Sequence, residues 1–121
     1  MSNAKEMVEL LMKVEGAVAA MLVDSSCGLV LAEKTSGDFD VDVAAAGNTK
    51  VVQAKRETMK RLGLESEIED ILITLCDQIH LITPWRKNPE VFGYLVIAQG
   101  GATLGMARKQ LKDGLAVLSS L

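Results

Sequence analysis

Apolar residues recur every three or four positions in three segments of this chain, and this spacing predicts three helices. The first ends at Gly16. The second begins at Asp40, whose side chain can cap it, and ends at Gly63. The third follows the Gly100–Gly101 turn. The apolar positions that define the first and third helices are Met7, Leu10, Leu11, Val14, Leu104, Ala107, Leu111, Leu115 and Leu118.

Most of the remaining apolar segments are apolar almost throughout, which is typical of buried strands rather than of strands with one exposed face. Turn residues separate them: 24–28, then Asp77 and Gln78, then a loop with Pro84 and Pro89. We therefore expect the order α-β-β-α-β-β-β-α, an α+β fold in which helices cover both faces of a sheet. The predicted strands are 17–23, 29–33, 71–76, 79–83 and 91–98.

Length and composition indicate one ordinary globular domain, 1–121. The chain is 49% hydrophobic and 24% charged, which suffices for one core but not for two. Thirteen Lys and Arg stand against 16 Asp and Glu, so no uniform positive field exists to hold nucleic acid or an anionic membrane. No apolar run approaches the ~20 residues of a membrane span. We expect a cytoplasmic protein without a signal peptide.

The two cysteines and the N-terminus carry no predicted function. Cys27 and Cys76 lie far apart, without a second ligand at metal-binding spacing, so we expect both to be reduced. Their expected places are a turn for Cys27 and the core for Cys76. Residues 1–4 are interpreted as a tag remnant or a disordered segment.

Candidate catalytic chemistry is sparse. His80, the single histidine, falls within a predicted strand and is interpreted as structural. The glycines of 100–105 precede a helix, but the phosphate-binding spacing is absent and Met106 stands where such a loop requires lysine. The acidic segment 65–70 lacks the spacing of a calcium loop and is expected to be a solvated linker. We therefore predict no catalytic residues, no metal site and no cofactor.

The helix at 40–62 is apolar over nearly twice the arc that packing on one sheet requires. The stripe expected to face the sheet contains Ala44, Gly47, Val51, Ala54, Thr58 and Leu62. A second stripe, about 100° away, contains Ala45, Asn48, Val52, the stem of Lys55 and Met59. We interpret the second stripe as a contact with another molecule, the alternative being a loop of the same chain.

Four segments, in this order and spacing, resemble the Roadblock family of the dynein light chain type. The resemblance extends from about Lys5 to Leu121 and departs at Asp77 and Gln78, where an Asp and Gly turn is common in the family. The segments are VEGAVAAMLVDSSCGLVLA, AAAGNTKVVQAK, IEDILITLCDQIHLITP and YLVIAQGGATLGMARKQL.

This resemblance implies a profilin-like, five-stranded antiparallel sheet. It also implies a homodimer in which two sheets join edge to edge along 71–76 and the two copies of helix 40–62 lie side by side. Family members act without chemistry of their own, as scaffolds and regulators of small Ras-like GTPases, including bacterial gliding-motility regulators that stimulate GTP hydrolysis. The implied function is a non-catalytic, homodimeric regulator or scaffold that binds such a GTPase.

The helix and the edge strand together give the predicted site. The predicted partner-binding residues are Asn48, Val52, Lys55, Arg56, Met59 and Lys60, with Arg56 and Lys60 as a basic rim. The predicted dimer-interface residues are Ala45, Asn48, Val52, Ile71, Ile73 and Leu75. The alternative function is a small-ligand sensor or adaptor domain in a signalling system, with a pocket lined by Met21, Cys76 or Trp85.

Overall fold

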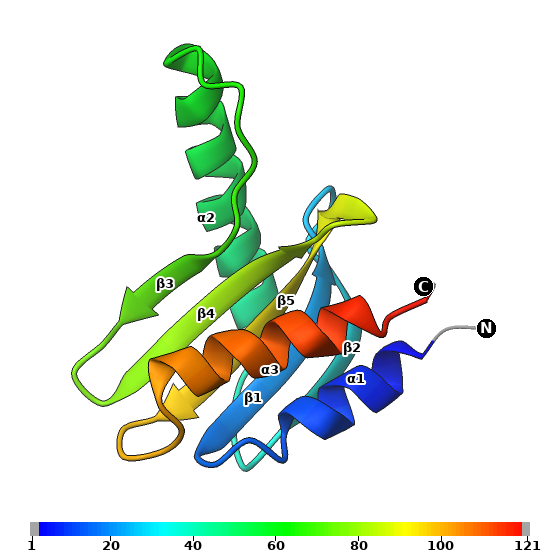
Figure 1. The fold of residues 1–121 in the computed structure, drawn as a ribbon, viewed down its shortest axis with the longest axis vertical. Coiled ribbons are helices and arrows are strands. Elements are labelled where there is room, and N and C mark those ends of the chain that lie inside the picture. Colours follow the sequence, from blue (N-terminus) through cyan, green and yellow to red (C-terminus); the bar gives the residue numbers. More distant parts are fainter. Residues whose placement is uncertain (1–2, 120–121) are drawn as a thin grey trace.

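The computed structural model describes residues 3–119, which form one antiparallel five-stranded sheet with three helices (Figure 1). The strand order across the sheet is β2-β1-β5-β4-β3, so β2 and β3 are its edges. This confirms the predicted α+β fold and its element order. The elements are α1 Ala4–Leu11, β1 Ala17–Asp24, β2 Leu29–Thr35, α2 Val41–Arg61, β3 Ile71–Thr74, β4 Gln78–Trp85, β5 Asn88–Ala98 and α3 Leu104–Ala116.

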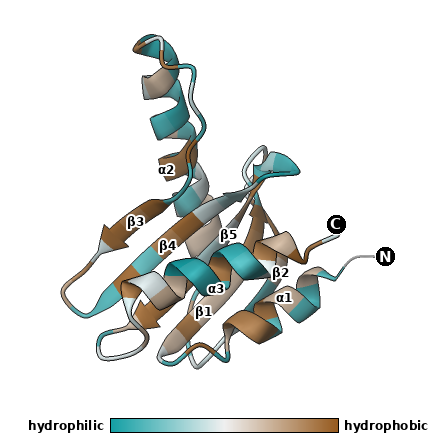
Figure 2. Ribbon diagram, in the orientation of Figure 1, coloured by the Kyte–Doolittle hydropathy of each residue, from teal (hydrophilic) through white to brown (hydrophobic). Residues whose placement is uncertain are grey.

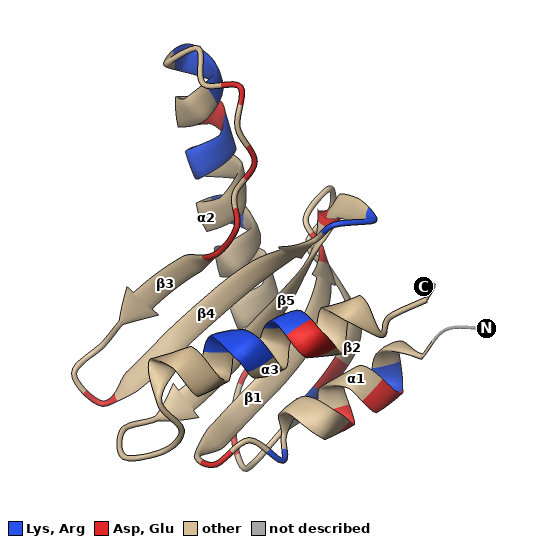
Figure 3. Cartoon of the chain, in the orientation of Figure 1, with Lys and Arg blue, Asp and Glu red and all other residues tan. Residues whose placement is uncertain are grey.

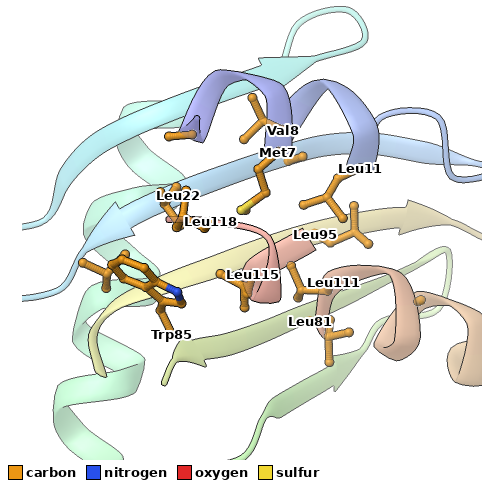
Figure 4. Close-up of a cluster of buried hydrophobic side chains, with 14 of the residues drawn as sticks. Met7, Val8, Leu11, Leu22, Leu81, Trp85, Leu95, Leu111, Leu115 and Leu118 are labelled. Carbon is orange, nitrogen blue, oxygen red and sulfur yellow. The ribbon is translucent and has the colours of Figure 1, made fainter. Parts of the chain in front are cut away.

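Helices cover both faces of the sheet, as the continuous apolar strands predict. In Figure 1, α1 and α3 lie in front of the sheet and α2 lies behind it. Each face has its own hydrophobic core. The front core includes Met7, Leu11, Leu95, Leu111 and Leu115 (Figure 4). The rear core includes Met21, Val52, Phe92, Tyr94 and Val96.

Gly93 allows α3 to pack closely on β5. A Cβ atom at this position would lie 2.8 Å from Cδ1 of Leu111, closer than real Cβ contacts come. The close packing of the front core therefore depends on glycine at position 93 as well as on the apolar residues of α3.

The β4–β5 hairpin is tighter than the sequence predicts. The two prolines were expected to break these strands, but β4 continues through Pro84 to Trp85 and β5 begins at Asn88. Pro84 lies beyond the part of β4 that β3 pairs with, and Pro89 lies beyond the part of β5 that β1 pairs with. Each proline thus lies where the strand has no neighbour on one side. Because no hydrogen bond between strands is needed there, the lack of an N–H on proline has no cost on that side.

Several local predictions were wrong at the ends of elements. The first helix ends at Leu11 rather than near Gly16, and Leu10 is exposed to solvent. β3 ends at Thr74, so Cys76 lies exposed in the turn after it and not in the core. Residues 12–16 follow the end of the helix and Cys76 lies in a turn, so they do not keep the periodic burial that the pattern assumed, whereas Leu10 lies within α1 on its solvent-exposed side.

Of the two interpretations of residues 1–4, disorder does not hold for the two residues that the structure describes. Ala4 is buried in the front core. Asn3 Nδ2 donates to the carbonyl of Val117 at 2.7 Å, which ties the two ends of the described chain together. Both residues therefore belong to the fold. Met1 and Ser2 lie outside the described residues.

Candidate functional site: the α2 face and the β3 edge

α2 is a long helix that only partly rests on the sheet. Its 21 residues extend over about 31 Å. At its start, Asp40 caps the helix by accepting from the Val43 amide at 3.0 Å, and at its end Gly63 has a φ of +71°. The C-terminal half projects past the sheet, and the segment 64–70 leads back from its tip to β3 (Figure 1). Much of the helix surface is therefore accessible.

The predicted orientation of this helix was wrong. Its buried residues are Ala45, Thr49 and Val52, which pack on the sheet, while Ala54 and Leu62 of the stripe expected to face the sheet are exposed. The stripe interpreted as a contact with another molecule is thus the one that faces the sheet. Ala45 and Val52 are 1% and 0% exposed, so a partner could not reach these two side chains in this protomer.

Arg56, predicted as part of an exposed basic rim, instead attaches α2 to two loops. Its guanidinium donates to Ser25 Oγ at 3.3 Å and to the Pro89 carbonyl at 2.5 Å. Gln53 Nε2 donates to the Ser25 carbonyl at 2.8 Å, so two successive turns of the helix hold the same serine. Ser25 also donates to the Glu90 carbonyl at 2.6 Å. We call Arg56, Gln53 and Ser25 the α2 anchor.

The α2 anchor was missed at the sequence level. Ser25 follows Asp24 in a turn-forming segment, and nothing in that pattern distinguishes a buried serine from an exposed one. Only the structure shows that Ser25 is 1% exposed and lies between β5 and α2.

A polar chain connects the sheet to the underside of α2. Tyr94 OH donates to His80 Nδ1 at 2.5 Å, and His80 Nε2 donates to Gln78 Oε1 at 2.9 Å. Burial lowers the pKa of His80, opposed by the charge of Asp77. Burial also raises the pKa of Tyr94, opposed by a hydrogen bond with Asn48. These neutral side chains link the two layers, in accord with a structural role for His80.

The β3 edge is short, apolar and open on one side. Among the described residues β3 pairs only with β4, in the register Ile71↔Ile82 to Thr74↔Ile79. Ile71 packs against the rear core, whereas Ile73 and Leu75 are 36% and 46% exposed. Figure 2 shows the edge strand as a hydrophobic segment. Natural proteins usually protect such an edge with charge, proline or a covering element.

The other predicted partner residues remain accessible to different degrees. Lys55 and Lys60 are exposed, and Met59 is half-buried. Asn48 is half-buried, with its Nδ2 donating to the Ala44 carbonyl at 2.8 Å. Figure 3 shows basic residues on the projecting end of α2 and acidic residues on the segment that follows it.

Sequence reasoning missed the apolar residues that α2 exposes. Val43 and Leu62 are 67% and 66% exposed, and Leu64 just after the helix is 52% exposed. The helical spacing of Leu62 was visible in the sequence, but it was assigned to contact with the sheet.

The structure separates the residues predicted to line a ligand pocket. Met21 is buried in the rear core, and Cys76 is exposed in a turn. Trp85 belongs to the front core and lines a cleft of about 720 Å³ between the segment 66–69 and α3. Within residues 3–119, no group of three His, Cys, Asp or Glu side chains could hold a metal ion. No helix in the same range is long and apolar enough to span a bilayer.

Comparison with known proteins identifies the fold through structure alone. No protein-family model matches the sequence, and no curated protein matches it. Similar solved structures include MglB from Myxococcus xanthus, with a TM-score of 0.81 and 18% identity over 93% of this chain and 89% of that chain. A Roadblock/LC7 domain from Streptomyces avermitilis has a TM-score of 0.79 and 12% identity over 93% and 91%.

A third similar structure is the gliding protein MglB from Thermus thermophilus, with a TM-score of 0.78 and 22% identity over 93% of this chain and 82% of that chain. In all three the match extends over most of both chains. The chain therefore has the Roadblock/LC7 fold.

Proposed function

We propose that this chain is a non-catalytic regulator or scaffold that forms a homodimer and binds a small Ras-like GTPase. The main supporting observation is the open apolar edge of β3, in a sheet whose rear face carries a long helix with exposed apolar and basic residues. The similarity in fold to Roadblock/LC7 domains and to MglB supports it.

The first step is dimerisation through β3. Antiparallel pairing of two β3 strands satisfies the free backbone groups of both edges and joins two five-stranded sheets. It also buries Ile73, which a single protomer leaves partly exposed on the α2 side, and it covers part of Leu75 just after the strand. The two copies of α2 then lie on the same face of the joined sheet.

The second step is GTPase binding on the face that carries both α2 helices. Lys55 and Lys60 supply positive charge, and Val51 and Ala54 supply small apolar contacts near them. Such a surface suits an acidic partner, because surface charge accelerates association while apolar groups hold the complex. The twofold axis passes between the helices, so one GTPase can contact both copies.

A binding experiment with charge-reversed variants tests the second step. The Ras-like GTPases of the native host, each loaded with GTPγS or GDP, are titrated against the immobilised dimer. We expect one of them to bind, with an association rate that falls roughly tenfold in the Lys55→Glu/Lys60→Glu variant at low salt. The matched control is Lys5→Glu/Lys13→Glu, which reverses two charges at and near α1.

Two results would contradict this function. In one, none of these GTPases binds the folded dimer in either nucleotide state. In the other, the control variant slows association as much as the α2 variant does, which would move the partner surface to the α1 and α3 face.

A small-ligand sensor is the second candidate function. One observation favours it, namely the cleft beside Trp85. That cleft lies on the α3 side of the sheet, away from the α2 face, so the two functions do not compete for the same surface.

A further inference from the structure

One feature that the proposed dimer and GTPase contacts do not explain is the cleft between the segment 66–69, the end of β4 and the C-terminal half of α3. Its volume is about 720 Å³. Pockets that bind small organic molecules commonly have volumes of ~300–1,000 Å³. Neither the β3 edge nor the exposed face of α2 contributes to it, so the proposed dimer and GTPase contacts leave it without a role.

Two largely buried residues on the floor of the cleft each carry a polar side-chain atom. Thr83 and Trp85 are 8% and 7% exposed, and both line the cleft. Within residues 3–119, neither the Thr83 hydroxyl nor the indole N–H takes part in a hydrogen bond. Among the described residues the only buried side-chain polar atom without a partner is Thr49 Oγ1, so the Thr83 hydroxyl and the Trp85 N–H are reached by solvent from the cleft and can donate to a bound molecule.

The pairing of β4 with β5 is irregular beside these groups. The register between β4 and β5 shifts between Pro84 and Trp85, at the end of the hairpin. In Figure 4 the Trp85 indole lies at the border of the front core, with its nitrogen on the side of Leu115.

The walls of the cleft are apolar and its rim has more positive than negative charge. Leu115 and Ile68 line it from α3 and from the segment before β3. Lys112 and the hairpin residues Arg86 and Lys87 supply three positive charges, against the two carboxylates of Glu67 and Glu69. The Arg86–Glu69 pair is long, 3.9 Å, and both side chains are mostly exposed, so it leaves Arg86 able to bind another anion.

We propose that this cleft binds a small molecule with an apolar body and one anionic group. The body packs between Trp85, Leu115 and Ile68. The anionic group lies at the rim near Lys112 and Arg86, and an acceptor atom of the ligand receives hydrogen bonds from the Thr83 hydroxyl and the Trp85 N–H. The site is independent of the proposed GTPase function and would stand if that function failed.

The single tryptophan of the chain provides the measurement, because Trp85 is the only fluorophore of its kind and lies in the cleft. The probe is 4-phenylbutyrate, and the comparison compound is 4-phenylbutylamine, which has the same body with the opposite charge. We expect a saturable change in Trp85 emission with the carboxylate, with a dissociation constant of about 1 mM or below. The amine should bind at least roughly tenfold more weakly.

Three variants locate the binding. Lys112→Glu should remove the preference for the carboxylate, and Thr83→Val should weaken its binding roughly threefold or more through loss of the hydroxyl. The control is Lys109→Glu, one turn earlier on α3, where the native lysine pairs with Asp113 at 2.8 Å and does not line the cleft. It should leave the titration unchanged.

The proposal fails if the carboxylate causes no saturable change in Trp85 emission. It also fails if carboxylate and amine bind equally, or if Lys109→Glu and Lys112→Glu have equal effects. Methyl chemical shifts of Leu115 and Ile68 in the titrated protein give a second readout, which must move with the same dissociation constant. Because Lys112 is exposed, its variant is expected to fold even if the Thr83 variant does not.

Discussion

His80 is the residue whose protonation the fold opposes most clearly. It lies half-buried on the α2 side of the sheet, where its Nδ1 accepts from Tyr94 and its Nε2 donates to Gln78. Burial lowers the pKa of His80 below its ordinary value of 6.5. The unfolded chain therefore binds a proton in a pH range where the folded chain does not.

This difference predicts how stability depends on pH. The contribution of His80 should be fully present above about pH 6.5 and should be lost as pH falls through the lower pKa of the folded state. Urea unfolding between pH 8 and pH 5 measures it. The free energy of unfolding should fall with acidification in the native protein and fall less in His80→Gln. Equal slopes for the two proteins would show that His80 does not contribute to the pH dependence of stability.

Arg56 should contribute to stability more than any other cation on α2. Its removal leaves the buried Ser25 hydroxyl and the Pro89 carbonyl without a donor, which predicts a loss of about 1–3 kcal/mol for Arg56→Ala. Arg56→Lys should recover only part of this, because an ammonium cannot reproduce the fork of the guanidinium.

Chemical denaturation measures this loss against a matched control. Arg61→Ala removes an exposed pair with Glu57 on the same helix and should cost no more than about 0.5 kcal/mol. Equal costs for Arg56→Ala and Arg61→Ala would show that the α2 anchor does not stabilise the helix.

At the scale of elements, the bounds of α2 were predictable but its rotation was not. Asp40 and Gly63 mark its ends by capping chemistry, which is local. Its rotation depends on which of two adjacent apolar stripes packs on the sheet, and the pairs Ala44–Ala45 and Val51–Val52 make the two nearly equivalent. The choice is made by tertiary contacts, among them the donation from Arg56 to Ser25, 31 residues away.

In the β4–β5 hairpin, too, the outcome depends on tertiary structure and not on local sequence alone. Two prolines predict a break when the strand is considered alone, because each lacks an amide hydrogen. They are compatible with strands here because Pro84 and Pro89 lie where a neighbouring strand has ended. The lengths of neighbouring strands decide this, and they cannot be obtained from the residues of one strand. The cleft beside Trp85 was likewise not predictable, since segments from three parts of the chain form it.

The β3 edge carries a prediction of its own. Ile73 lies on the α2 side of the edge strand and is partly exposed, so Ile73→Lys should place a charge in the joined sheet and weaken the proposed dimer at least roughly tenfold. The neighbouring exposed residue Thr74 alternates to the other side, so Thr74→Lys is the control and should weaken the dimer much less. Sedimentation velocity over a concentration series measures both. Equal effects would indicate an interface that does not involve the α2 side of β3.

In the whole molecule, the two faces of the sheet differ in how completely helices cover them. The front face is closed by two helices, α1 and α3, and the packing of α3 depends on Gly93. The rear face has one helix, which contacts β1 and β2 and extends beyond the sheet. The rear face and the adjoining β3 edge therefore hold the surface that a second protomer and a partner can use, and the proposed function assigns both to it.

Sedimentation equilibrium of the purified native chain shows whether two protomers join, as the proposed pairing of two β3 edges requires. We expect a mass of about twice the 13.0 kDa of one chain at low micromolar concentration. A folded protein that sediments as a single 13.0 kDa species at that concentration would contradict it.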